Sequence, residues 1–146
     1  MTRSRMRGSY TPRKRKLSNV RFYPTEYQEC KTFWEWSGIF PDYRANLVKH
    51  CNERIGGAWY TGALKAIGMR KGLPDYQYTM PNEQGFNGLW IEMKRIDEKG
   101  KVTREEQNEW IERLNQNGYY ATYCYGAMDA IKVFLDYVNN RIKKDD

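Results

Sequence analysis

The sequence predicts an α/β fold in which helices flank a small mixed β-sheet. Segments with helical spacing of apolar residues alternate along the chain with short strand-like segments, in the order helix, strand, helix, strand, strand, helix, strand, helix. The chain has 146 residues, enough to bury an adequate core and too few for a second full domain. We therefore expect one domain over residues 21–146, preceded by a basic, flexible N-terminal arm over residues 1–20.

The first helix is predicted from a capping box. Thr25 and Gln28 have the spacing of an N-cap and its reciprocal partner, and the helix runs to about Trp36, before Pro41 breaks the pattern. Glu26 lies in the first turn, on or beside the face that the helix buries. Two explanations remain open for this carboxylate: a favourable interaction with the helix N-terminus, or a role near a bound metal.

A strand and a short helix follow. Residues 45–51 have strand character, and residues 58–67 can form a short helix in which Leu64 and Ile67 supply apolar contacts. Arg70 and Lys71 come next and place two cations directly ahead of the following strand. They would meet a phosphate there, but contact with a partner subunit or with solvent would fit the sequence equally well.

Two strands separated by a loop rich in turn-forming residues form the predicted hairpin. They cover residues 76–80 and 89–95. Strand side chains alternate between faces, so one face of the second strand carries an apolar set that enters the core and the other carries Glu92 and Lys94. Pairing of the strands can bring Asp75 within reach of Glu92. The result is two hard oxygen ligands of the kind that Mg2+ prefers, beside an ammonium group.

The remaining elements are a helix, a strand and a helix, over residues 103–117, 119–125 and 127–141. Thr103 and Glu106 form a predicted capping box at the start of the first of these helices. Gln107 begins its buried stripe, so its amide must find hydrogen bonds. It either anchors backbone or reaches into a polar site.

Charge is concentrated at the N-terminus. The chain carries 25 Lys and Arg against 18 Asp and Glu, and the first 16 residues contain seven of the cations and no acid. Such an arm favours contact with a nucleic-acid backbone, although basic termini also occur as solvated ends without a function. The cations of the arm closest to the domain are Arg13, Lys14, Arg15 and Lys16.

Several classes of site and location are disfavoured. No apolar stretch is long enough to cross a bilayer, so we expect a soluble cytoplasmic protein. Cys30, Cys51 and Cys124 are widely separated and are expected to be buried thiols. His50 is the only histidine, which leaves almost no material for a Cys/His zinc site or a Ser/His/Asp triad. Any metal must be held mainly by oxygen.

Three segments taken together resemble a known nuclease pattern. They are Gly72-Leu73-Pro74-Asp75, Glu92-Met93-Lys94 and residues 103–107. In this order they are similar to the PD-(D/E)XK nuclease superfamily, and specifically to its virus-type replication-repair branch, VRR-NUC. The resemblance extends over about residues 25–125, most of the chain.

The resemblance implies a restriction-endonuclease-like core and hydrolysis of DNA phosphodiesters with Mg2+ or Mn2+. Asp75, Glu92 and the main-chain carbonyl of Met93 would ligate the metal, and Lys94 would position the attacking water. Glu26 and Gln107 match the acidic residue of the family's first helix and the glutamine of the helix after the Glu-x-Lys strand. These two would complete the catalytic set.

The resemblance also implies a substrate and an assembly. Small stand-alone members look like dimeric phage or prophage enzymes that act on branched DNA such as Holliday junctions, so we expect a homodimeric, structure-selective endonuclease in a bacterial host. Two alternatives remain. The chain could be a catalytically silent DNA-binding module, or a phage structural protein whose charged residues form surface ion pairs.

Overall fold

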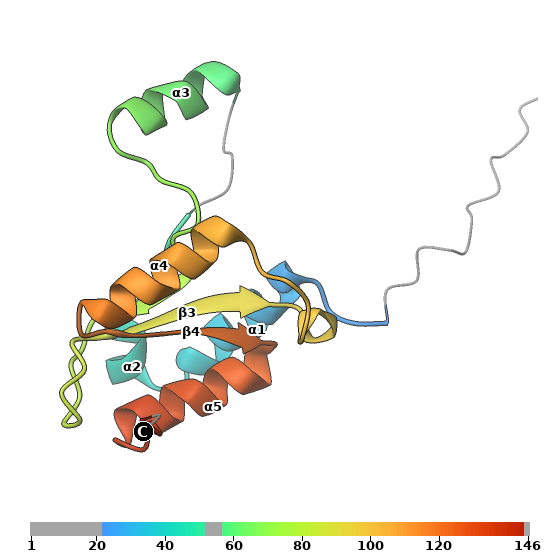
Figure 1. Ribbon diagram of the computed structural model, residues 1–146. Coiled ribbons are helices and arrows are strands. Elements are labelled where there is room, and N and C mark those ends of the chain that lie inside the picture. Colours follow the sequence, from blue (N-terminus) through green and yellow to red (C-terminus); the bar gives the residue numbers. More distant parts are fainter. Residues whose placement is uncertain (1–21, 52–56, 145–146) are drawn as a thin grey trace, which may run out of the picture.

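The computed structural model describes residues 22–51 and 57–144 (Figure 1). The predicted arm, with Arg13, Lys14, Arg15 and Lys16, lies outside these ranges. The helices and strands follow one another as α1 Glu26–Ser37, α2 Pro41–Ala45, β1 Leu47–Lys49, α3 Ala58–Ala66, β2 Tyr76–Tyr78, β3 Leu89–Lys94, the 3-10 turn η2 Ile96–Glu98, α4 Glu105–Gln116, β4 Tyr120–Tyr125 and α5 Ala127–Val138. None of the helices in these ranges has the length and apolar character needed to traverse a bilayer.

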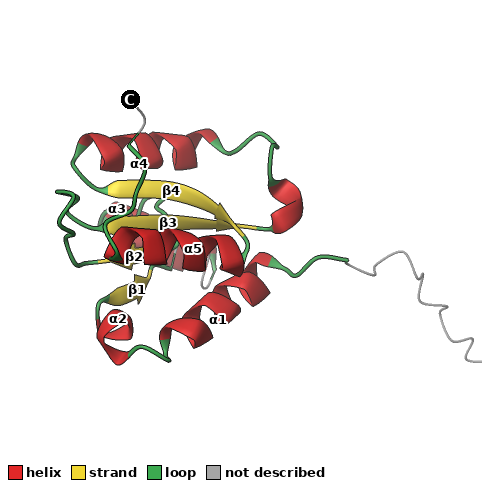
Figure 2. Ribbon diagram, turned by 90° about the horizontal axis from the view of Figure 1, so that it is seen from below, coloured by secondary structure: helices red, strands yellow, loops and turns green. Residues whose placement is uncertain are grey.

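The strands form one mixed sheet in the order β1-β2-β3-β4. β1 pairs with β2 and β2 with β3 in antiparallel fashion, whereas β3 and β4 are parallel and are joined through α4. Figure 1 shows α4 on one side of β3 and β4 and α5 on the other, and Figure 2 shows α1 beside α5. The predicted α/β architecture with helices flanking a small mixed sheet is confirmed.

The main core fills the space between the sheet and the pair α1 and α5. Phe33 and Phe134 are fully buried there, and the Phe33 ring meets the Tyr76 ring edge-on at 5.1 Å between centroids. The predicted core face of β3, Leu89, Ile91 and Met93, is at most 1% exposed. Full burial of one such side chain contributes about 1.5–3 kcal/mol.

A smaller apolar cluster lies on the opposite face of the sheet. Trp90, Leu114 and Ala121 are buried there beneath α4. β3 is therefore covered on both faces, and five of its six residues are buried. A charged side chain on the α4 side of this strand must consequently be held in a largely dry environment.

The start of α1 is fixed by the predicted capping box. The Gln28 amide N–H donates to the Thr25 hydroxyl at 3.2 Å, and the Thr25 N–H donates to the Gln28 side chain at 2.8 Å. One turn into the helix, the buried Glu29 accepts the Ala127 N–H at 2.6 Å and so caps α5. The sequence did not suggest this cap, because it links helices at opposite ends of the chain.

Pro41 does more than break a helix. It is the first residue of α2, a position that suits proline because its missing N–H would have no helical partner. The predicted strand over 45–51 is correspondingly short, since α2 takes Ala45 and only Leu47–Lys49 pairs with β2.

The predicted capping box at Thr103 is wrong. α4 begins at Glu105 with Arg104 as N-cap, and no side chain caps it. The Thr103 hydroxyl instead donates to the Asn108 side chain at 2.5 Å. Of the three cysteines expected to be buried, Cys30 and Cys124 are buried, but Cys51 is exposed.

Helix α3 makes little contact with the rest of the fold. Figure 1 shows it standing away from the sheet, and none of its residues is buried. Trp59 on this helix and Ile67 just after it are each 83% exposed. Leu64 is half-buried, whereas the apolar contacts expected from Ile67 are not made among residues 22–51 and 57–144.

Candidate active site

The pairing of β2 with β3 brings the two predicted carboxylates into one cleft. Tyr76 is paired with Ile91 and Gln77 with Trp90. Continued by one residue, the same register sets Asp75 directly across from Glu92. Like charges at opposed positions of an antiparallel pair destabilise it, so these two side chains require compensation from their surroundings.

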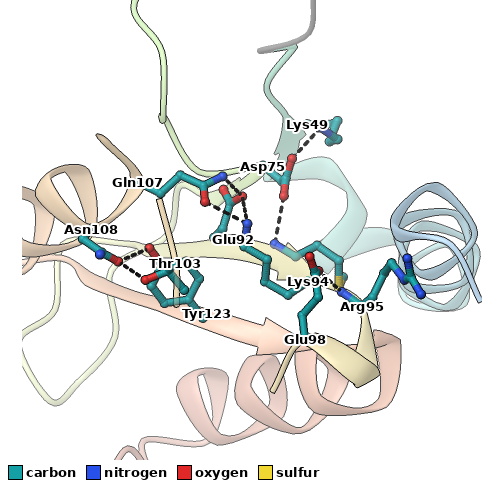
Figure 3. A network of polar contacts seen from close by, with 11 residues as sticks. Lys49, Asp75, Glu92, Lys94, Arg95, Glu98, Thr103, Gln107, Asn108 and Tyr123 are labelled. Carbon is teal, nitrogen blue, oxygen red and sulfur yellow. Dashed lines mark hydrogen bonds and ion pairs between the residues drawn. The ribbon is translucent and has the colours of Figure 1, made fainter. Parts of the chain in front are cut away.

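Asp75 is held through both carboxylate oxygens (Figure 3). Its Oδ2 accepts the Met93 N–H at 2.8 Å, and its Oδ1 accepts from the Lys49 ammonium at 3.0 Å. The N–H and C=O of one strand residue point to the same edge. The Met93 carbonyl therefore also faces the side on which Asp75 lies.

Glu92 is held by a helix on the opposite side of the sheet from the main core. Its Oε1 accepts the Gln107 amide at 2.5 Å, and the Lys94 ammonium lies 3.6 Å from the same oxygen. Gln107 accepts in turn from Lys94 at 2.7 Å. Of the two roles left open for Gln107, reaching into a polar site is the observed one.

Lys94 rests on a second polar network. Its ammonium lies 5.9 Å from the centre of the Tyr123 ring on β4. The Tyr123 hydroxyl and the Thr103 hydroxyl both donate to Asn108 Oδ1 at 2.5 Å. The lysine thus lies between Tyr123 of β4 and Gln107 of α4, and its side chain is only 12% exposed.

The carboxylates crowd one another electrostatically. Burial, followed by the negative charge of Asp75, raises the pKa of Glu92 well above its usual range, and Lys94 opposes this rise. Glu26, at the N-terminus of α1, has its pKa raised by the same two causes in the same order. Glu26 therefore lies close enough to Asp75 for the two carboxylates to interact electrostatically.

These groups open into one cleft of about 680 Å³. Glu26, Asp75, Glu92, Lys94 and Gln107, the full predicted catalytic set, all line it. Further cations contributed to its wall are Lys49, Lys71, Lys101 and Arg104. The wall therefore offers both acids for a cation and basic groups for an anionic substrate.

Arg70 and Lys71, the two cations ahead of β2, lie in different places. Lys71 lines the cleft, and its carbonyl accepts the Trp110 indole N–H at 2.9 Å. The Arg70 guanidinium instead lies 5.0 Å from the centre of the Trp110 ring, where Arg113 also approaches at 5.1 Å. Arg70 is therefore placed on the surface of α4 and Lys71 in the cleft.

The donor set of the cleft fits a hard divalent cation. Asp75, Glu92 and the Met93 carbonyl offer oxygen alone, the ligand type that Mg2+ prefers. Within residues 22–51 and 57–144, no group of three or more His, Cys, Asp or Glu side chains is arranged to hold a metal. The set accordingly depends on a main-chain oxygen as its third member. A cation there would stabilise the opposed, ionised carboxylates.

Lys49 was not identified from the sequence as a residue of the site. Its contact with Asp75 depends on the pairing of β1 with β2, which sets Lys49 opposite Tyr76. The sequence indicated two separate strands but not that they are neighbours. The available signal was a lysine two residues after Leu47, and therefore on the same face of the predicted strand as that apolar residue.

The comparisons with known proteins bear on the fold. No protein-family model and no curated protein matches the sequence. A solved structure described as a VRR_NUC domain protein is similar, with a TM-score of 0.66 and 22% sequence identity, over 80% of this chain and 90% of that chain. At this identity the similarity establishes the fold. The VRR-NUC-like fold implied by the three sequence segments is thereby confirmed.

Gly72 controls how closely α4 approaches the cleft. Its φ is +83°, a region that side chains disfavour, and a Cβ built there would lie 2.6 Å from the carbonyl carbon of Glu106. Glu106 directly precedes Gln107 on α4. The absence of a side chain at Gly72 thus permits the helix to bring Gln107 to Glu92.

We expect Gly72→Ala to lower the free energy of unfolding by about 2–4 kcal/mol, from backbone strain and from displacement of α4. Urea denaturation measures this. Gly85→Ala is the matched control, since Gly85 has φ +93° but a Cβ added there would meet nothing within 4 Å. That variant should lose only about 1–2 kcal/mol. Equal losses in the two variants would contradict a steric role for Gly72.

Proposed function

We propose that this protein is a divalent-metal-dependent endonuclease that hydrolyses phosphodiester bonds in DNA. The observation that carries the proposal is the meeting of Asp75, Glu92 and Lys94 in one cleft, with Asp75 directly before β2 and the other two on its partner strand β3. The similarity in fold to a VRR_NUC domain protein supports the same class of chemistry.

Two kinds of residue would divide the work. Asp75, Glu92 and the Met93 carbonyl would hold Mg2+ or Mn2+, which when bound supplies Lewis-acid polarisation of the scissile phosphate and acidification of the attacking water. Glu26 would share the negative side of the cleft with them, because it lines the same wall and its pKa responds to Asp75.

Lys94 would orient the attacking water and offset charge that develops on the phosphate. Its ammonium is held by Gln107 at 2.7 Å and lies 3.6 Å from Glu92, so its position is defined before substrate arrives. Gln107 acts on this lysine and on Glu92 at once. It would therefore be a positioning residue for both.

Branched DNA such as a Holliday junction is the proposed substrate. The cations Lys71, Lys101 and Arg104 on the cleft wall can contact the phosphate backbone without reading sequence. The basic arm, with seven cations in its first 16 residues, would add further backbone contacts. Recognition through phosphates suits selection of a DNA shape over a sequence.

A homodimer is the proposed assembly. The helix α3 carries exposed apolar side chains, among them Trp59 and Tyr60, and the described residues of the chain bury none of its side chains. Exposed apolar side chains gathered on one short helix favour association with a partner surface. A second copy related by a two-fold axis would cover these side chains and would provide two sites for a symmetric junction.

The two alternative functions are less well supported. A silent DNA-binding module has no chemical need for opposed carboxylates, which cost stability where no cation is bound. In a structural protein the charges would form surface pairs. The side chains of Glu92 and Lys94 are only 5% and 12% exposed, unlike exposed ion pairs, which typically contribute about 0–1 kcal/mol.

Asp75→Asn should abolish metal-dependent cleavage, because it replaces a charged ligand with a neutral one of the same shape. We expect a loss of about three orders of magnitude or more. The assay compares labelled junction, flap and duplex DNA with Mg2+ and with Mn2+. Asp42→Asn, an exposed acid in the first turn of α2, is the control. Cleavage retained by Asp75→Asn would point to a contaminant or to a different site.

Lys94→Ala should abolish turnover while leaving DNA affinity largely intact, because the lysine acts on the attacking water more than on binding. Single-turnover cleavage gives the first quantity, and fluorescence anisotropy with a labelled junction gives the second. Circular dichroism controls for folding. A proportionate loss of cleavage and of binding would argue against a catalytic lysine.

Trp59→Ser together with Ile67→Ser should convert a dimer into a monomer, because both side chains are exposed in the single chain and would be buried by a partner. Size-exclusion chromatography with light scattering measures the mass. Met128→Ser, at an exposed methionine on α5, controls for a general loss of apolar surface. A wild-type protein that is monomeric with and without DNA would refute the assembly.

A further inference from the structure

The ammonium of Lys49 forms an ion pair with Asp75, the carboxylate that would bind the metal. Lys49 Nζ lies 3.0 Å from Asp75 Oδ1, and it also donates to the His50 carbonyl at 2.9 Å. The Lys49 side chain is 39% exposed, against 12% for Asp75. The lysine therefore reaches in from the solvent side of the cleft, which it lines.

Backbone pairing fixes the position of the Lys49 main chain. Lys49 is opposite Tyr76 in the β1–β2 register, and the next residue, His50, donates its N–H to the Asp75 carbonyl at 2.7 Å. The His50 ring stacks on Trp90 at 5.0 Å between centroids, and its Nε2 is 3.0 Å from Gln77 Oε1. The end of β1 is thus anchored beside the cleft, so a change in the position of the ammonium must come from the side chain of Lys49.

A cation at Asp75 must contend with this ammonium. Asp75 Oδ2 is engaged by the Met93 N–H and Oδ1 by Lys49. Each oxygen has a second lone pair, but a divalent cation and an ammonium on the same oxygen would repel each other strongly. Binding of the cation at Oδ1 would therefore drive the lysine away.

Of the two lysines at the carboxylates, Lys49 is the one that can leave. Lys94 is nearly enclosed and is bonded to Gln107. Lys49 is more exposed, and a lysine is a compact charge on a flexible four-carbon stem. Swung from Asp75 into the cleft, its ammonium would meet the space that a DNA phosphate would enter.

We propose that Lys49 is a substrate-binding residue. Its ammonium holds Asp75 in place before a divalent cation binds, and afterwards donates its hydrogen bond to a non-bridging phosphate oxygen of the DNA instead. The inference rests on the proposed nuclease function and adds a residue to it. Lys49 competes with the cation when DNA is absent and assists binding when DNA is present. Removing its charge should therefore change the two affinities in opposite directions.

The test is Lys49→Gln in the full-length protein. Isothermal titration of the DNA-free protein with Mn2+ should show binding about two- to fivefold tighter than in wild type, the size expected for loss of a partly exposed ion pair. Binding of a labelled four-way junction with Mn2+ is then measured by anisotropy in a Lys94→Ala background. Its affinity should fall, and the slope of log affinity against log salt should decrease by about 0.9, one phosphate contact.

Three variants serve as controls. Lys49→Arg keeps the charge and should stay near wild type in both assays. Lys49→Met keeps the apolar stem and should reproduce Lys49→Gln. Lys132→Gln removes a comparable ammonium, 2.9 Å from Asp136 on the exposed face of α5, and should alter neither affinity.

The outcomes separate the inference from the function. Unchanged or weakened Mn2+ binding by Lys49→Gln, or an unchanged salt slope, would overturn the role of Lys49 and leave the nuclease proposal standing. A wild-type protein that binds no Mn2+, or an Asp75→Asn variant that binds it as tightly as wild type, would overturn both. Tighter Mn2+ binding with weaker junction binding supports the transfer.

Discussion

Two carboxylates directly opposed across a hairpin repel each other, and the arrangement of this cleft follows from how the protein offsets that repulsion. Asp75 receives the Met93 N–H and the Lys49 ammonium, while Glu92 receives the Gln107 amide beside Lys94. These partners come from β1, β3 and α4, so three elements meet at the two carboxylates. The compensation remains incomplete, because burial and the charge of Asp75 still raise the pKa of Glu92. A hard divalent cation would complete it.

Much of the architecture could be predicted from local patterns. The capping box at Thr25, the division of the β3 side chains between two faces and the last helix are each encoded within a few residues, and all three were found in the structure. The nearness of Asp75 to Glu92 could also be predicted from the sequence, because two successive strands joined by a loop rich in turn-forming residues pair as a hairpin. Local patterns failed at α4, where Thr103 bonds Asn108 instead of capping the helix.

What the sequence could not supply is the pairing of elements distant along the chain. Lys49 reaches Asp75 only because β1 takes the edge beside β2, and Glu29 caps α5 only because α1 and α5 lie side by side. No periodicity within a segment specifies such neighbours. The same limit applies to the predicted apolar contacts of Leu64 and Ile67, since Leu64 is only half-buried in α3 and Ile67, just after it, is exposed.

The parallel pairing of β3 with β4 has a consequence for the order in which the cleft forms. Parallel strands require a crossover, and here the crossover is α4, which carries Gln107. The cleft wall also includes Glu26 from the first helix, so formation of the cleft joins segments that are far apart in the sequence. During synthesis, α4 and β4 emerge from the ribosome after the hairpin. Until they do, Glu92 lacks its contact with Gln107 on α4, and Lys94 lacks its contact with Tyr123 on β4. Truncated translation products would therefore carry the acidic hairpin without an assembled cleft around it.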